Sequence, residues 1–224
     1  MARIALQVAQ AGAARRVRVL FYGELEAATA GFSNDRRIGG GGFGSVFKAV
    51  GLSGLGECAV KRLDEGSTQG QLEFLQEVQV LGGCRHENLM PLFGLSADRA
   101  PERAGGSVCL VSPLMRGGRY ARTAPRAART PELLAWDVRL RIGAEIGSAL
   151  EYLHTAEEET RKPQVFHRDV KPANVLLDAD LHARLGDVGL ARALEVGEHI
   201  STLVAGTPAF IDPNYQVRVL SPKP

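Results

Sequence analysis

A cluster of glycines in this 224-residue chain has the spacing of a phosphate-binding loop. The stretch 39–46 reads G-G-G-G-F-G-S-V and satisfies the pattern G-x-G-x-x-G-x-V. Glycine lets the backbone approach phosphate oxygens closely and point its N–H groups at them. Taken alone, the cluster fits a flexible linker equally well. A strand pattern follows it, which disfavours a dinucleotide-binding loop, and the lack of Gly-Lys-Ser/Thr excludes a Walker A loop.

A lysine and a glutamate downstream could complete a phosphate site. Lys61 ends the strand-like stretch Cys-Ala-Val-Lys, so Ala59 and Lys61 point to the same face. The small alanine could cover an adenine while the ammonium reaches phosphates. The helical pattern that follows offers two carboxylates, Glu73 and Glu77, and Glu77 lies closer to the apolar face, where it could hold Lys61. Each of these residues, taken singly, also fits an exposed charge on the surface.

The most specific stretch of the chain is His167–Leu177, which reads H-R-D-V-K-P-A-N-V-L-L. It matches H-R-D-x-x-x-x-N, the catalytic loop of protein kinases, and Asp187-Val188-Gly189 follows in the expected order. With the glycine loop and the strand lysine, these motifs make the chain similar to the protein kinase family from about Phe21 to Tyr215. Three stretches most resemble the branch that contains plant receptor-like kinases and animal interleukin-receptor-associated kinases: Phe21–Ser33, Trp136–His154 and Gly206–Tyr215.

The resemblance implies ATP as the bound nucleotide. The loop glycines would cover its phosphates, Lys61 would hold the α- and β-phosphates, and Glu77 would orient Lys61. The hinge beside the adenine would be Val111–Met115, with Ser112 guarding the back of the pocket. The residues expected to bind the nucleotide are Ile38, Gly39, Gly41, Gly44, Val46, Ala59, Lys61, Met115 and Leu176.

The resemblance also implies a reaction and a metal ion. Asp169 would accept the hydroxyl proton of a protein substrate, and Lys171 would contact the γ-phosphate. Asn174 and Asp187 would bind Mg²⁺, which prefers hard oxygen donors. A lysine two places after Asp169 resembles serine/threonine kinases rather than tyrosine kinases.

Residues around the catalytic loop suggest how the protein is regulated. Arg168 beside the catalytic aspartate suggests control by phosphorylation, because a phosphate could pair with its guanidinium. Ser201 and Thr202 are the candidate acceptors. Thr207 is expected to have a structural role that faces the substrate.

The sequence departs from the family pattern at two residues and at its end. Val188 replaces an aromatic residue and is expected to underfill its site, while Asn214 replaces a glutamate. The chain stops at Pro224, before the helices that normally support the catalytic loop. We therefore expect an incomplete C-lobe with exposed apolar surface that is poorly stable or covered by a partner.

The elements that must position these residues divide into a β-rich half and a helical half. An antiparallel hairpin is expected from Ser45–Val50 and Glu57–Leu63, followed by a helix at Gln69–Leu81. Short strands are expected around Leu89–Leu95, Val108–Val111 and Val165–Leu190. Trp136–His154 reads as a long amphipathic helix with its apolar face at Ile142, Ile146, Ala149, Leu150 and Leu153. The expected fold is α+β and protein-kinase-like, with an antiparallel N-lobe sheet, one N-lobe helix and a mainly helical, incomplete C-lobe.

Composition limits the other function classes. With 27 basic and 25 acidic residues, the net charge of +2 gives no drive toward nucleic acid. No apolar run approaches membrane-spanning length. The three cysteines form neither a metal-binding pair nor a disulfide framework, which favours a reducing, cytoplasmic location. The Arg- and Ala-rich N-terminus reads as a frayed end, with an organelle-targeting peptide as the alternative.

The predicted organisation follows the two lobes. Residues 1–31 are an N-terminal extension, 32–112 the N-lobe, and 113–224 a partial C-lobe with a basic insertion at 116–131 that reads as a solvated loop. The predicted function is ATP-dependent phosphoryl transfer to serine or threonine hydroxyls of proteins. The alternative is a nucleotide-binding pseudokinase or scaffold, or an inactive truncated kinase fragment.

Overall fold

The computed structural model describes residues 17–41, 44–64, 68–96, 108–120, 134–157, 159, 162–194 and 205–213. Their contacts divide the chain into two compact units. Unit 1 takes the described parts of Met1–Arg85 and Met90–Met115. Unit 2 takes His86–Leu89 and the described parts of Arg116–Pro224. Each unit is described by itself below.

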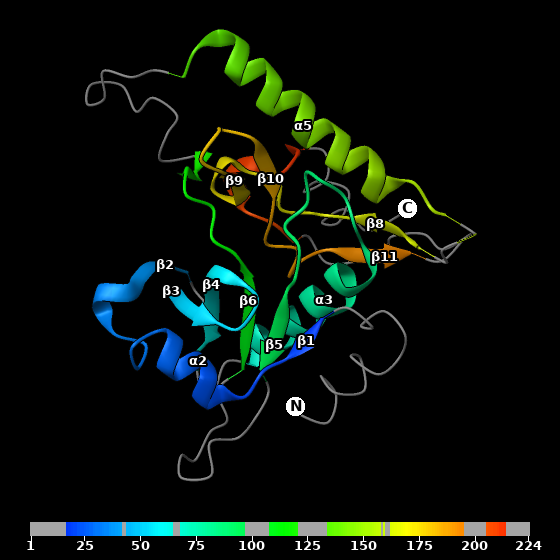
Figure 1. The fold of residues 1–224 in the computed structure, drawn as a ribbon. Helices are drawn as coiled ribbons and strands as arrows, with labels where there is room; N and C mark the ends of the chain where they lie inside the picture. Colours follow the sequence, from blue (N-terminus) through cyan, green and yellow to red (C-terminus); the bar gives the residue numbers. More distant parts are fainter. Residues whose placement is uncertain are drawn as a thin grey trace. The chain divides into compact units, whose positions relative to one another are not determined.

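Unit 1 is built on a six-stranded sheet with the order β1-β5-β6-β4-β3-β2 (Figure 1). All neighbouring strands pair antiparallel except β1 and β5, which are parallel. The strands are β1 (Arg18–Val19), β2 (Arg37–Gly41), β3 (Gly44–Leu52), β4 (Gly56–Leu63), β5 (Gly94–Ser96) and β6 (Cys109–Pro113).

The hairpin of β3 and β4 forms where the alternating sequence predicts it. Each strand extends one or two residues beyond the predicted bounds. The connecting turn uses Gly51, Gly54 and Gly56 at φ of 88°, 72° and 66°, a region that glycine enters without steric cost. The strand expected around Leu89–Leu95 is much shorter: β5 begins only at Gly94, and Leu89 instead forms an isolated bridge with Leu185.

The two faces of the sheet carry different residues because side chains alternate along each strand. Phe47 and Ala49 of β3 lie on one face with Cys58 and Val60 of β4, and all four are buried in the core of unit 1. Lys61 lies on the opposite face of the sheet. The hairpin therefore separates the structural core from the face that bears the lysine.

The core face is covered by an element that the sequence analysis assigned to an extension. The helix α2 (Tyr22–Ala28) packs on β3 (Figure 1). Leu20, Tyr22 and Leu25 are buried with the strand residues. A 3₁₀ turn, η1 (Asn34–Arg36), leads into β2. Residues 17–31 therefore contribute to the core of unit 1, while residues 1–16 lie outside the described residues.

The helix α3 (Thr68–Gly83) is two residues longer at its end and one at its start than predicted. The predicted apolar face is confirmed, because Phe74, Val78 and Leu81 are all buried. Glu77 is buried among them. This places a carboxylate on the packed side of the helix.

Unit 2 is organised around the helix α5 (Trp136–His154), whose bounds match the prediction. Ile142, Ile146, Ala149 and Leu153 are buried, and Leu150 is half-buried. The described short strands of this unit are β7 (Gly118–Arg119), β8 (Gln164–Phe166), β9 (Val175–Leu177), β10 (Ala183–Leu185) and β11 (Arg192–Leu194). They form the sheets β10-β9-β7 and β11-β8. The short 3₁₀ helices η2 (Pro172–Asn174) and η3 (Pro208–Phe210) complete the described elements.

A carboxylate on α5 holds β10 in place. Glu145 accepts hydrogen bonds from the backbone N–H of Ala183 at 2.6 Å and from His182 Nδ1 at 2.7 Å. On the other side, Asn88 donates to the carbonyl of Ala183 at 3.1 Å. Because β10 leads into Asp187, these bonds fix the approach to a predicted metal ligand.

The start of the basic stretch 116–131 differs from a solvated loop. Gly118 and Arg119 pair with Leu177 and Leu176 of β9. A Cβ added to Gly117 would lie 2.3 Å from the carbonyl oxygen of Asp178, so this turn packs against the strand end. Residues 121–131 lie outside the described residues.

No helix in the described part of the chain has the length and apolar character needed to cross a membrane.

Candidate active site

Lys61 on β4 forms an ion pair with Glu77 on α3, with 2.8 Å between Lys61 Nζ and Glu77 Oε2. The two side chains are 28% and 11% exposed, so water screens the pair only partly. The other helix glutamate, Glu73, accepts a hydrogen bond from Gln69 at 3.2 Å. The predicted contact between Lys61 and Glu77 is therefore present.

The glycine loop joins β2 to β3. Gly39 pairs with Val46 and Gly41 with Gly44, so the loop folds back as a hairpin. A Cβ added to Gly44 would lie 2.4 Å from the carbonyl oxygen of Arg62. That position requires glycine because β4 approaches too closely for any side chain. Gly42 and Phe43 lie outside the described residues.

The sheet register places several predicted nucleotide residues beside Lys61. Val46 is its direct partner on β3, and Ala59 lies two residues before it on β4. Ser112 of β6 is the partner of Ala59. These four side chains share one face of the sheet because paired residues in a ladder point to the same side. Three other predicted nucleotide residues lie elsewhere: Ile38 on β2, Met115 just after β6, and Leu176 on β9 of unit 2.

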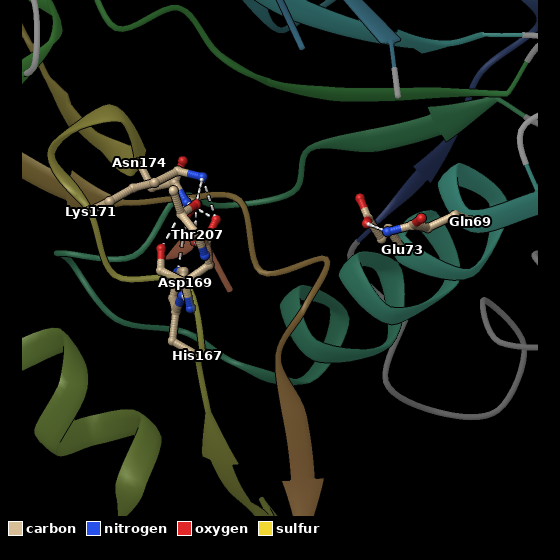
Figure 2. Close-up of polar contacts among 8 residues, drawn as sticks. Gln69, Glu73, His167, Asp169, Lys171, Asn174 and Thr207 are labelled. Atoms are coloured by element: carbon tan, nitrogen blue, oxygen red, sulfur yellow. Dashed lines mark hydrogen bonds and ion pairs between the residues drawn. The ribbon is translucent and has the colours of Figure 1, made fainter. Parts of the chain in front are cut away.

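Four donors converge on the carboxylate of Asp169 in unit 2 (Figure 2). Lys171 Nζ donates to Oδ2 at 2.6 Å, and Asn174 Nδ2 donates to the same oxygen at 3.0 Å. The other oxygen, Oδ1, accepts from the backbone N–H of Thr207 at 3.0 Å and from its hydroxyl at 2.7 Å. The carboxylate is 6% exposed and is held in one orientation by both oxygens.

These donors keep the carboxylate ionised. Burial raises the pKa of the Asp169 carboxyl, but the hydrogen bonds from Lys171, Thr207 and Asn174 outweigh it. The net pKa lies below the ordinary value for aspartate. Asp169 is therefore an anion at neutral pH.

His167 connects this loop to the residue before Asp187. Its Nδ1 accepts a hydrogen bond from the backbone N–H of Asp169 at 3.3 Å, so Nε2 carries the proton and donates to the carbonyl of Gly186 at 3.1 Å. Burial lowers the pKa of His167 below its ordinary value. The buried imidazole is thus neutral and joins the two segments through both nitrogens. The sequence analysis missed this role, although the histidine begins the catalytic-loop motif.

Asn174 and Asp187 present oxygen atoms suited to a hard cation. The amide nitrogen of Asn174 donates to Asp169, so its amide oxygen stays outside those bonds. The backbone of Gly186 donates to the carbonyl of Asn174 at 2.9 Å, which ties Asp187 to the same loop. Asp187 is exposed and has φ of 61°, an uncommon conformation for a residue with a side chain. One amide oxygen and one carboxylate fit a divalent ion such as Mg²⁺.

Thr207 has a larger part in the site than expected. Its hydroxyl donates to Asp169 and also accepts from Lys171 Nζ at 2.7 Å. The chain reaches this point through Gly206, at φ of 131°, where an added Cβ would lie 2.6 Å from the carbonyl oxygen of Arg168. Thr207 follows Asp169 by 38 residues, and only the motif Gly-Thr-Pro hinted at a link.

The remaining predicted residues have different outcomes. Val188 is fully buried, although its side chain is smaller than the aromatic ring of the family pattern. Ser201, Thr202 and Asn214 lie outside the described residues, and their roles stay predictions.

Unit 1 carries the Lys61–Glu77 ion pair, and unit 2 carries a loop that holds an ionised aspartate beside a lysine and an asparagine. Both features are those of a protein kinase domain. The chain belongs to the protein kinase domain family, whose profile matches residues 32–217. This membership confirms the α+β, two-lobe kinase fold expected from the sequence. A kinase domain implies ATP and a divalent metal ion.

Proteins similar to this chain include several from Arabidopsis thaliana. A probable L-type lectin-domain containing receptor kinase, S.7, is 39% identical over 201 residues, which are 89% of this chain and 28% of the relative. The serine/threonine-protein kinase BRI1-like 2 is 38% identical over 206 residues, 90% of this chain and 17% of the relative. The predicted similarity to plant receptor-like kinases is thereby confirmed. The chain thus spans less than a third of the length of each of these two relatives.

Proposed function

We propose that this chain transfers the γ-phosphoryl group of ATP to serine or threonine hydroxyls of protein substrates. The observation that carries the proposal is the state of Asp169. Its carboxylate is ionised, buried and oriented by four hydrogen bonds on the loop that bears the kinase motif. A group held in this way can orient a substrate hydroxyl and accept its proton as the bond to phosphorus forms.

Lys171 supports the same step through its charge. Its ammonium lies 2.6 Å from Asp169 Oδ2 and 2.7 Å from the hydroxyl of Thr207. A cation fixed at this point can attract the γ-phosphoryl group and offset the negative charge that develops during transfer. Its contact with Thr207 also fits the serine/threonine type, to which the name of BRI1-like 2 refers.

We assign the metal to Asn174 and Asp187 and the phosphates to Lys61. Asn174 and Asp187 would hold a Mg²⁺ ion through their side-chain oxygens, and the ion would supply positive charge to offset that of the phosphates. The amide nitrogen of Asn174 is held by Asp169, which aims the oxygen away from that bond. Glu77 keeps the ammonium of Lys61 at a defined position on its strand. We also assign to nucleotide binding the other residues predicted from the sequence. These are Ile38, Gly39, Gly41, Gly44, Val46, Ala59, Met115 and Leu176.

Transfer of labelled γ-phosphate tests the proposal. The chain, with ATP and Mg²⁺, is incubated with a generic protein acceptor, and the product is hydrolysed to identify the phosphorylated amino acid. Asp169→Asn is the comparison, because it keeps the size of the side chain and removes the charge. We expect a loss of about 10²–10⁴-fold in rate, with phosphoserine or phosphothreonine as the product. Equal background in both proteins would disprove the proposal.

A nucleotide-binding scaffold is the second candidate, and Val188 favours it. A valine stands where the family has an aromatic residue, although Asp187 beside it is retained. In this case ATP with Mg²⁺ would bind without transfer. Two results together would identify the scaffold. The chain would bind ATP with a measurable dissociation constant, and phosphate transfer would not differ between wild type and Asp169→Asn.

A further inference from the structure

The segment Arg18–Arg36, here called the N-terminal strap, is built into unit 1 although most of it lies outside the stretch matched by the family profile. At its start, β1 pairs with β5, and Arg18 Nη1 donates to the carbonyl of Ser53 in the β3–β4 turn at 2.6 Å. Along its length, Leu20 and Leu25 are buried against the core face of the sheet. The strap is thus attached to β5, to the β3–β4 turn and to the core face of the sheet.

The strap contains a strained turn after α2. Ala30, Gly31 and Phe32 have φ of 54°, 72° and 54°, so two residues with side chains adopt the left-handed region. The hydroxyl of Thr29, itself fully buried, donates to the carbonyl of Leu25 at 2.7 Å and accepts from the N–H of Phe32 at 3.1 Å. Backbone strain of this kind persists only where surrounding contacts enforce it. In this turn, the strained backbone fixes the position of the Phe32 ring.

The Phe32 ring lies in a stack that ends on β4. It contacts Tyr22 at 5.4 Å and Phe47 at 5.3 Å between ring centroids. The guanidinium of Arg62 lies 4.5 Å from the centroid of Phe32 and 5.4 Å from that of Phe47. A guanidinium over aromatic faces is attracted by the negative charge of the rings. The strap therefore holds Arg62 by a directional contact.

Arg62 is adjacent to Lys61 and to the glycine loop. Neighbouring residues of a strand point to opposite faces, so Arg62 is fixed on the core face while Lys61 reaches Glu77 on the other. The carbonyl of Arg62 also closely approaches Gly44, the last glycine of the loop. A shift of the β4 backbone at Arg62 would move both the ammonium and the loop.

We propose that the N-terminal strap positions Lys61 through the stack of Phe32 on Arg62. Arg62 is a positioning residue, since it acts through Lys61 and the β4 backbone. The consequence for nucleotide binding rests on the proposed function. The effect on the Lys61–Glu77 pair does not.

The test measures how fast an amine-reactive acylating reagent labels Lys61 in the full chain, followed by peptide mass spectrometry. An ammonium held in an ion pair reacts slowly, because only the free neutral amine is a nucleophile. We expect Arg62→Ala to speed the labelling of Lys61 by about threefold or more. Arg62→Lys, which keeps a cation over the rings, should give a rate between those of wild type and Arg62→Ala.

Two further variants distinguish a specific effect on Lys61 from a general destabilisation of unit 1. Phe32→Leu removes the ring but keeps an apolar side chain, and should match Arg62→Ala. Leu52→Ala weakens the core at the far end of the same hairpin, where Leu52 is 6% exposed, and should leave the labelling rate unchanged. Unchanged Lys61 labelling in folded Arg62→Ala and Phe32→Leu would overturn the proposal. An equal increase in Leu52→Ala would also overturn it.

A second measurement separates this inference from the proposed function. In an active chain, Arg62→Ala should raise KM for ATP and leave KM for the protein acceptor unchanged; a change in both would overturn the nucleotide part of the inference. If wild type transfers no phosphate, the proposed function fails, and the labelling rates still decide whether the strap positions Lys61.

Discussion

At the scale of single residues, a small number of hydrogen-bond donors determine the charge and orientation of the Asp169 carboxylate. Three side chains and one backbone N–H hold a nearly buried carboxylate as an anion. Hydrogen bonds to charged groups contribute about 1.5–3 kcal/mol each. Removing any one donor therefore changes both the orientation of the carboxylate and its affinity for protons.

Replacing Thr207 by valine tests the donor that comes from the activation segment. Thr207→Val removes one hydrogen bond to the ionised carboxylate, so the pKa of Asp169 should rise toward its ordinary value. The acidic limb of the pH–rate profile then moves to higher pH, and the rate at neutral pH falls. Thr207→Ser keeps the hydroxyl and should behave like wild type. Identical profiles for valine and serine would contradict this role.

The neutral histidine of the loop predicts a dependence of stability on pH. The pKa of His167 is lowered in the folded chain, so below about pH 6.5 the unfolded chain binds a proton that the folded chain does not. The stability that the neutral imidazole provides is complete above that pH and is lost as the pH falls toward the folded pKa. The slope reaches about 1.4 kcal/mol per pH unit for one proton.

Urea unfolding between pH 5 and pH 7 measures this slope. His167→Gln, which retains one donor and one acceptor, should show a shallower decline than wild type. A decline of the same steepness in both proteins would show that other groups cause it.

At the scale of elements, the short helix α2 covers the core face of the sheet in unit 1. With seven residues it is too short to be stable alone, so it must be held by packing on β3. Leu25 is fully buried at this contact. The same packing closes the core face of the sheet, which leaves the opposite face for Lys61.

Truncating Leu25 measures the contribution of this contact. Leu25→Ala should lower the free energy of unfolding by about 2–5 kcal/mol, since the cavity forms in a closed core. Leu72→Ala is the control, because Leu72 lies on α3 and is 65% exposed. The control should stay within about 0.5 kcal/mol of wild type in chemical denaturation. Similar losses in both variants would contradict the assignment of α2 to the core.

At the scale of the whole molecule, the candidate residues are divided between two units. Lys61 and Glu77 belong to unit 1, whereas Asp169, Asn174 and Asp187 belong to unit 2. The proposed reaction requires the phosphates of ATP to bind at Lys61 and the metal ion to bind at Asn174 and Asp187. The effect of a substitution in either unit can therefore be read from the binding of the same ligand.

Thermal unfolding with ATP and Mg²⁺ tests this requirement. A ligand that binds only the folded chain stabilises it by about 2.7 kcal/mol at 100 times its Kd. We expect a clear rise in Tm for wild type and a smaller rise for Lys61→Met and for Asp187→Asn, one variant from each unit. A full rise in either variant would remove that residue from the nucleotide site. EDTA should abolish the contribution of Asp187 and leave that of Lys61.

The sequence by itself determined the parts of this protein that depend on local pattern. The helix α5 has the predicted bounds, because its apolar residues repeat every three to four positions over nineteen residues. The hairpin of β3 and β4 was predictable from alternation and from the glycines of its turn. The kinase motifs identified the family because their residue types and order are specific, whatever the distances between them.

Only the tertiary structure decided the contacts between distant segments. Thr207 meets Asp169 across 38 residues, β1 pairs with β5 across more than seventy, and Phe32 stacks on Arg62. Local periodicity carries no information on such pairs, because they form only when the chain closes long loops and the buried apolar area outweighs the lost conformational entropy. The family motifs therefore predicted which residues act, while long-range packing decided what holds them in place.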